Sequence, residues 1–198
     1  MLLLWAVVST GVAQAAGRVA LVIGNGSYSE DIGELSNTIN DAVAIRKLLK
    51  QLDFDVQMEL DLDRKAMVEV IRDFATGAKG ADAALIFYAG HGAEINGKNI
   101  LFPVDLSLPS ALTEEELLEV KPLGSKRAQR ALLREKRLNA LEDGTVSLDS
   151  LSRAASSRSE RAIIVVDACR DDAFNRMVDI KNITSALRRQ GRAKGALY

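Results

Sequence analysis

One histidine and one cysteine stand out in this chain of 198 residues, because each directly follows an apolar run. His91 comes after residues 83–90 (AALIFYAG), and Cys169 comes after residues 162–168 (AIIVVDA). Short apolar runs of this kind are typical of buried strands. If the two strands are parallel neighbours, their carboxyl ends place a base and a nucleophile at one edge of a sheet. This is the pair of groups that a cysteine hydrolase requires.

The chemistry of such a pair is well defined. Only a few per cent of a free thiol is thiolate near neutral pH, and an imidazole that takes the proton leaves an imidazolium that stabilises the thiolate. Attack on an amide carbonyl creates an oxyanion, for which the backbone N–H groups of Gly92 and Cys169 are the candidate donors. A glycine at position 92 lets the chain approach closely. Spacing alone leaves a second interpretation open, in which Cys169 is a small buried hydrophobe and His91 an ordinary surface residue.

The elements that must position these residues alternate along the chain. Apolar patterning and turn residues predict strands over 18–23, 54–60, 83–89 and 162–167, and a hairpin over 95–103 around Asn96-Gly97. Apolar residues at i, i+3 and i+4 predict helices over 40–52, 63–76 and 147–155. This order predicts an α/β three-layer sandwich, with a mostly parallel sheet and helices on both faces. Ligands bind such sheets beyond the carboxyl ends of the strands, where His91 and Cys169 are expected.

Residues 107–145 do not fit this alternation. An acidic stretch at 114–119 is followed by the helix breakers Pro122 and Gly124 and then by a basic, helix-like segment. Seven basic residues lie between Lys121 and Arg137, against the single acid Glu135. We expect a charged insertion, a solvated helical excursion between two strands.

The overall composition excludes several kinds of partner and site. With 26 Lys+Arg against 27 Asp+Glu, no global field attracts nucleic acid or an anionic membrane. A lone cysteine excludes an internal disulfide framework and any multi-cysteine zinc site.

Residues 1–16 carry no charged side chain and are too short to span a bilayer as a helix. With Ala13-Gln14-Ala15 as a cleavage site, they resemble a secretory signal that lacks its basic region. We therefore expect a leader at 1–16, a folded domain at 17–198 and a periplasmic or secreted protein. If the stretch is instead an arm packed on the core, the protein is cytoplasmic.

Six segments in order resemble one family: 18–28 (RVALVIGNGSY), 35–42 (LSNTINDA), 53–56 (DFDV), 85–92 (LIFYAGHG), 100–105 (ILFPVD) and 163–171 (IIVVDACRD). Together they resemble the bacterial caspase-like cysteine peptidases, the metacaspase and orthocaspase branch of the caspase–hemoglobinase fold. The resemblance covers most of 18–175 and leaves the insertion outside. It implies that His91 is the base and Cys169 the nucleophile of a dyad that acts through a thioester acyl-enzyme.

The resemblance also implies a substrate class. In the metacaspase branch the Asp at the position of Asp167 lines an acidic pocket, together with an Asp from the segment that matches Asn40-Asp41. A pair of carboxylates prefers a guanidinium or ammonium group and repels the Asp side chain that animal caspases select. We therefore expect an endopeptidase that cleaves proteins or peptides after Arg or Lys. The alternatives are a helix N-terminal acid for Asp41 and a structural hydrogen-bond acceptor for Asp167.

Many metacaspases bind calcium, but here Asp105 lacks paired acids and the late ligand position is Arg176. The sequence therefore predicts no cofactor or metal. Residues 24–27 (GNGS) lack the ending of a phosphate-binding loop. Residues 194–198 (KGALY) resemble the start of another strand, so that either the chain is a fragment or its sheet stops early. This leaves a second function open, a non-catalytic caspase-like interaction module.

Overall fold

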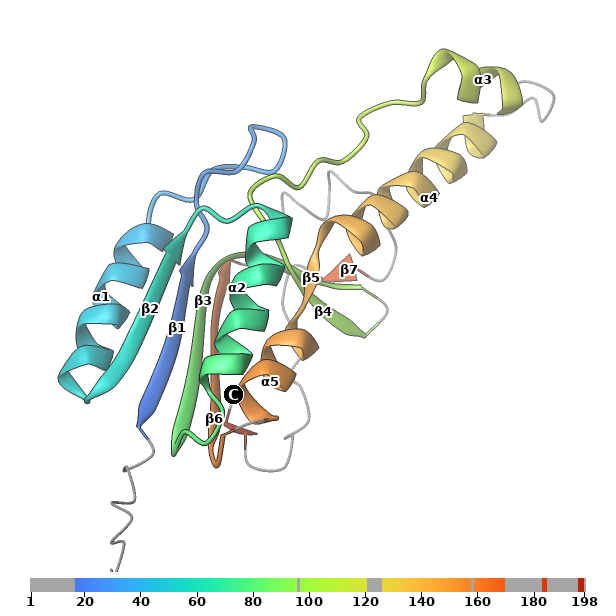
Figure 1. Cartoon of the computed structure of the whole chain (residues 1–198). Coiled ribbons are helices and arrows are strands. Elements are labelled where there is room, and N and C mark those ends of the chain that lie inside the picture. Colours follow the sequence, from blue (N-terminus) through green and yellow to red (C-terminus); the bar gives the residue numbers. More distant parts are fainter. Residues whose placement is uncertain are drawn as a thin grey trace, which may run out of the picture.

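The computed structural model describes residues 17–95, 97–120, 126–157, 159–169, 183–184 and 196–197 (Figure 1). The expected leader lies outside these residues. The helices are α1 (Thr38–Gln51), α2 (Arg64–Gly77), α3 (Glu114–Val120), α4 (Lys126–Gly144) and α5 (Leu148–Ser156). The strands are β1 (Arg18–Gly24), β2 (Phe54–Leu60), β3 (Ala83–Ile95), β4 (Lys98–Leu101), β5 (Val146–Ser147), β6 (Ala162–Cys169), β7 (Ile183–Thr184) and β8 (Ala196–Leu197).

The sheet has a parallel part and an antiparallel part that share β3. Parallel pairing runs in the order β2-β1-β3-β6-β8. The carboxyl half of β3 pairs antiparallel with β4 and β7, and β4 pairs antiparallel with β5. The mostly parallel sheet expected from the sequence is therefore confirmed, and β8 supplies the further strand that residues 194–198 suggested.

Alternating residues of the strands pack on opposite faces of the sheet. Leu21, Ile86 and Ile164 belong to a buried cluster with residues of α2 and α5, whereas Val22 and Phe87 pack with residues of α1. Figure 1 shows α1 on one side of the sheet and α2 and α5 on the other. Each buried side chain of this size contributes about 1.5–3 kcal/mol relative to exposure. The structure is the expected three-layer sandwich.

The expected hairpin and helix starts are present. Ile95 is the partner of Lys98 across the turn, and Gly97 has a φ of 82° that favours glycine. Asp63 begins the second helix as its N-cap, since its side chain accepts a hydrogen bond of 2.7 Å from Ala66 N–H. None of the helices within the described ranges combines the length and apolarity that crossing a bilayer demands.

The largest difference from the predicted strands is at the end of the third one. The sequence placed the end of the third strand at Ala89 and His91 beyond it, but β3 continues to Ile95. The residues after Ala89 remain extended because β4 offers them a new antiparallel partner on one side. What ends near His91 is the parallel pairing with β6, so the carboxyl edge of the parallel sheet lies where it was expected.

The insertion forms two helices that extend away from the sheet (Figure 1). At its base, Leu141 is fully buried in a cluster with Tyr28 and Ile32, and Leu138 packs against the same cluster. Farther out, Leu118 is 63% exposed. The expected helical excursion is confirmed, but the carboxyl-terminal part of α4 is part of the core rather than solvated.

Candidate active site

The backbone of β3 and β6 brings the two singular residues together. His91 and Cys169 are Cα partners and form the last pair of the parallel ladder. Neighbouring strands lie about 4.7–4.9 Å apart. Of Cys169, the structure describes the backbone only, so the adjacency is argued from the strand register. The register thus gives the adjacency that a thiol–imidazole dyad needs, while the catalytic roles of the two residues stay predictions.

The His91 ring is held by a loop that follows β1. The ring is buried, and its Nε2 lies 2.7 Å from the carbonyl oxygen of Gly33. A carbonyl oxygen only accepts, so Nε2 must carry a proton, and in the neutral ring the lone pair lies on Nδ1. The ring of Tyr28 packs against it in an edge-to-face arrangement, with centroids 4.6 Å apart. These contacts orient the imidazole, and in the neutral ring they make Nδ1 the nitrogen that carries the lone pair.

Two tyrosine hydroxyls hold the backbone of His91. The Tyr28 hydroxyl accepts from His91 N–H at 3.0 Å and donates to the Phe102 carbonyl at 3.0 Å. It thereby bridges an N–H and a carbonyl that a regular antiparallel ladder would join by a direct hydrogen bond. The Tyr88 hydroxyl donates to the His91 carbonyl at 2.7 Å. Burial raises the pKa of Tyr28 to about 12, although hydrogen bonds that include Tyr88 act to lower it. Tyr28 is therefore a neutral structural group next to the candidate base at ordinary pH.

Neither tyrosine was recognised in the sequence. A signal existed for Tyr88, because it lies within an apolar run in which a buried hydroxyl must find a hydrogen-bond partner. Tyr28 carried no such signal, since it lies in a loop without periodicity.

Gly92, the first candidate oxyanion donor, is buried beside His91 and pairs with Leu101 of β4. Phe102 N–H donates to the His91 carbonyl, so the ladder bonds fall at His91 rather than at Gly92. The alternation of an antiparallel ladder then turns Gly92 N–H away from β4. The group therefore points toward β6, the strand that carries Cys169, and its role as an oxyanion donor remains a prediction.

The two expected specificity acids line one pocket. Asp41, near the start of α1, and Asp167, two residues before Cys169 on β6, border a cavity of about 170 Å³. Glu34 lines the same cavity and adds a third carboxylate that the sequence analysis missed. The loop around it also contains Glu30 and Asp31, and nothing in the sequence distinguishes the acid that turns toward the pocket. Among the described residues that line this cavity, three are acidic and none is a lysine or an arginine, so this part of the lining is negatively charged.

The loop between β1 and α1 is anchored by Asp61. One Asp61 oxygen accepts from Gly26 N–H at 2.8 Å and from Ser27 N–H at 2.9 Å, and the other accepts from the Ser27 hydroxyl at 2.8 Å. Partial burial acts to raise the pKa of Asp61, but these hydrogen bonds outweigh it, and the pKa lies below its usual value. The loop amides are thus occupied by the protein's own carboxylate rather than open to a phosphate.

Asp105, the acid considered for calcium, has a structural contact. Its Oδ1 accepts from Arg64 N–H at 2.9 Å, in the first turn of α2. In the part of the chain that the structure describes, no three His, Cys, Asp or Glu residues are grouped to hold a metal. Position 176 lies outside that part.

Comparisons with known proteins identify the family of the chain. The model of the caspase domain family matches residues 17–194. The mucosa-associated lymphoid tissue lymphoma translocation protein 1 homolog of Mus musculus is 38% identical over 100 residues, which are 50% of this chain and 12% of that protein. The human protein is 37% identical over 95 residues, 48% of this chain and 11% of its own length. Caspase a of Danio rerio is 33% identical over 100 residues, 44% of this chain and 26% of its own length.

The matched region therefore spans a small part of these relatives, whereas the family model covers nearly the whole chain. The chain belongs to the caspase domain family of peptidases.

Proposed function

We propose that the protein is a cysteine endopeptidase that cleaves after Arg or Lys, of the metacaspase and orthocaspase branch. One observation carries the proposal. His91 of β3 and Cys169 of β6 form the last parallel pair of the sheet, and β6 also carries Asp167, an acid of a cavity lined by three carboxylates. Cleavage after a basic residue requires a nucleophile that lies close to a cavity selective for cations.

The proposed mechanism follows from the orientation of His91. Its Nδ1 takes the proton of the Cys169 thiol, and the thiolate attacks the carbonyl carbon of the substrate. The N–H groups of Gly92 and Cys169 donate to the resulting oxyanion. The C–N bond then breaks as the imidazolium protonates the departing amine, which leaves a thioester. Water activated by the neutral imidazole hydrolyses the thioester and restores the thiol. Throughout, Gly33 accepts from Nε2 and holds the ring in place.

Substrate selection is assigned to the three carboxylates of the cavity. A guanidinium group bonds a carboxylate through two parallel N–H donors, and an ammonium group through a point charge. We therefore expect Arg and Lys to be accepted and Asp to be repelled by Asp41, Asp167 and Glu34. The sequence of residues 1–16 supports export as a further part of the proposal, which a cell fractionation would test.

A panel of peptide amides with Arg, Lys or Asp before the cleaved bond tests this function. We expect turnover of the Arg and Lys peptides, none of the Asp peptide, and no activity in Cys169→Ala. Asp167→Asn and Asp41→Asn should each lower kcat/KM for the Arg peptide at least about tenfold, because a charge-assisted hydrogen bond contributes about 1.5–3 kcal/mol. Asp55→Asn, on the exposed part of β2, is the matched control and should change nothing.

Two results would contradict the proposal. Faster cleavage of the Asp peptide would contradict the assignment of the acidic cavity to a basic substrate side chain. An absence of turnover, together with no labelling of Cys169 by a thiol-directed arginyl inhibitor, would favour the caspase-like interaction module instead.

A further inference from the structure

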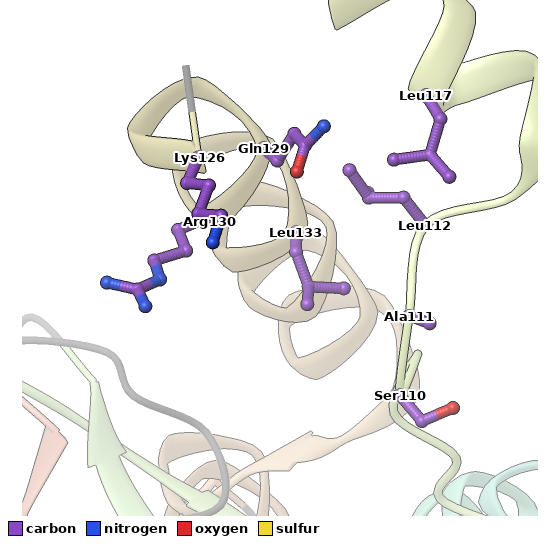
Figure 2. Close-up of a pocket in the computed structure, with 8 residues that line it drawn as sticks. All are labelled: Ser110, Ala111, Leu112, Leu117, Lys126, Gln129, Arg130 and Leu133. Atoms are coloured by element: carbon purple, nitrogen blue, oxygen red, sulfur yellow. The ribbon is translucent and has the colours of Figure 1, made fainter.

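A second cavity lies in the insertion, outside the candidate active site. It has a volume of about 360 Å³ and lies between α4 and residues 110–117. Figure 2 shows Leu112, Leu117 and Leu133 facing the gap between these two segments, whereas the Lys126 and Arg130 side chains extend away from the leucines. The volume is within the range of about 300–1,000 Å³ that is common for ligand pockets.

The walls of this insertion pocket are held by defined contacts. Thr113 and Glu116 form reciprocal hydrogen bonds at the start of α3, in which Thr113 N–H donates to Glu116 at 2.8 Å. Glu116 also pairs with Lys136 of α4. Arg137 donates to the carbonyls of Pro109 and Ser110 at 2.9 and 3.3 Å. The leucines are therefore presented by a tied helical hairpin.

The basic residues at the outer end of α4 differ in their contacts from Lys136 and Arg137, which bind Glu116 and two backbone carbonyls. Lys126, Arg130 and Arg134 are spaced by four residues and follow one side of the helix, beside Arg127. Among the residues with a described position, none of these four forms an ion pair with an acid. Four like charges on one helix repel each other, which is destabilising. A partner with negative charge would relieve this repulsion.

We propose that the insertion pocket binds an acidic peptide segment that carries a large apolar side chain. The apolar side chain would occupy the gap between Leu112, Leu117 and Leu133, and the flanking carboxylates would pair with Lys126 and Arg130. A polyanion without apolar groups would leave the leucines uncovered, and a neutral apolar peptide would leave the cations unmatched. Because no residue of this pocket lines the candidate active site, we assign the acidic segment to a separate partner protein.

The experiment measures binding rather than activity, which keeps it independent of the proposed function. The whole chain with Cys169→Ala is titrated against fluorescent six-residue peptides, with anisotropy as the readout. We expect the peptide EELFEE to bind at least about tenfold more tightly than QQLFQQ, which removes the charge, and than EESSEE, which lacks the apolar pair. Raising the salt from about 0.05 to 0.5 M should weaken the binding of EELFEE, since the ion pairs are exposed.

Variants of the pocket locate the binding. Arg130→Glu and Leu133→Asp should each weaken the binding of EELFEE at least about tenfold, and Leu112→Ser serves as a second apolar variant. Lys65→Glu changes the charge by the same amount on an exposed position of α2 and should leave the affinity unchanged. Circular dichroism verifies that each variant is folded. Equal binding of QQLFQQ, an equal loss in Lys65→Glu, or tighter binding of anionic lipid vesicles or of a short DNA than of EELFEE would overturn the proposal.

Discussion

The imidazole of His91 has its orientation determined before any substrate arrives. The Gly33 carbonyl accepts from Nε2, the Tyr28 ring packs edge-to-face with the imidazole, and the Tyr28 hydroxyl accepts from the His91 backbone N–H. A base that is already oriented avoids an entropic cost at the moment of proton transfer. Because Tyr28 takes part in both the ring contact and the backbone contact, this side chain should influence the candidate base more than any other neighbour.

Replacing Tyr28 with Phe tests this idea. The ring contact stays, but His91 N–H loses its hydroxyl acceptor, and we expect a loss of about 1–3 kcal/mol in the free energy of unfolding in urea. Alkylation of Cys169 by iodoacetamide at neutral pH should also become slower, because the base is less well oriented. Thr76→Val removes an exposed hydroxyl on α2 and should change neither quantity. An unchanged alkylation rate in a destabilised Tyr28→Phe would restrict the hydroxyl to a structural role.

The same variant has a distinct pH dependence. The pKa of Tyr28 is about 12 in the folded protein against an ordinary value of 10.0. The unfolded chain therefore loses this proton first, and the stabilising effect is complete below pH 10 and is lost as the pH rises toward 12. A difference of two pKa units between the folded and unfolded states corresponds to about 3 kcal/mol in the free energy of unfolding. The wild type should lose stability more steeply than Tyr28→Phe in this window, and parallel curves would contradict the assignment.

At the scale of elements, β3 is the component that assembles the site. Its first half pairs with β1 and β6, and its second half pairs with β4 and β7. The transition between the two parts lies next to Gly90, where a Cβ atom would lie 2.5 Å from the Tyr88 hydroxyl and 2.7 Å from the Tyr28 hydroxyl. A side chain at this position would therefore push apart the two groups that hold His91.

We accordingly expect Gly90→Ala to lower the free energy of unfolding by about 1–3 kcal/mol, the usual cost of overpacking. Gly77→Ala is the matched control, because nothing lies within 4 Å of a Cβ at the end of α2. There the loss of backbone freedom in the unfolded chain should give a neutral or slightly stabilising effect, up to about 1 kcal/mol. Urea denaturation of both variants measures the difference, and a Gly90→Ala protein as stable as Gly77→Ala would show that the hydroxyls can move aside.

For the molecule as a whole, the insertion is joined to the loop that contacts His91. Leu138 and Leu141 of α4 pack in one cluster with Tyr28 and Ile32 of that loop. The outer part of the insertion, which carries the proposed peptide pocket, is continuous with this base through α4. The base of the insertion and the candidate active site should therefore unfold as one cooperative unit.

Leu141→Ala tests this cooperativity. Leu141 is 0% exposed, and removing it should cost about 2–5 kcal/mol while a single unfolding transition is kept. Leu118→Ala, at a position that is 63% exposed, should change the stability by no more than about 0.5 kcal/mol. Thermal unfolding followed by tyrosine fluorescence and by circular dichroism compares the two. A separate early transition for the insertion would contradict the prediction.

The sequence by itself determined the elements and their order. The strand predicted at 54–60 has the bounds of β2, and the helix expected at 63–76 begins at its Asp63 cap. Hydrophobic periodicity and capping depend on residues a few positions apart, which is why they can be read locally. The placement of His91 and Cys169 near the edge of the parallel sheet follows from the same local patterns, once parallel pairing is assumed.

Only the tertiary structure decided what surrounds these residues. The Gly33 carbonyl meets the His91 ring across 58 positions of the chain, and the Tyr28 hydroxyl meets that of Tyr88 across 60. Glu34 joins the acidic cavity from the same loop. An aperiodic loop carries no pattern that shows where its carbonyls and carboxylates point. Their positions depend on the packing of segments far apart in the sequence, so the orientation of the base and the third acid became visible only in the folded chain.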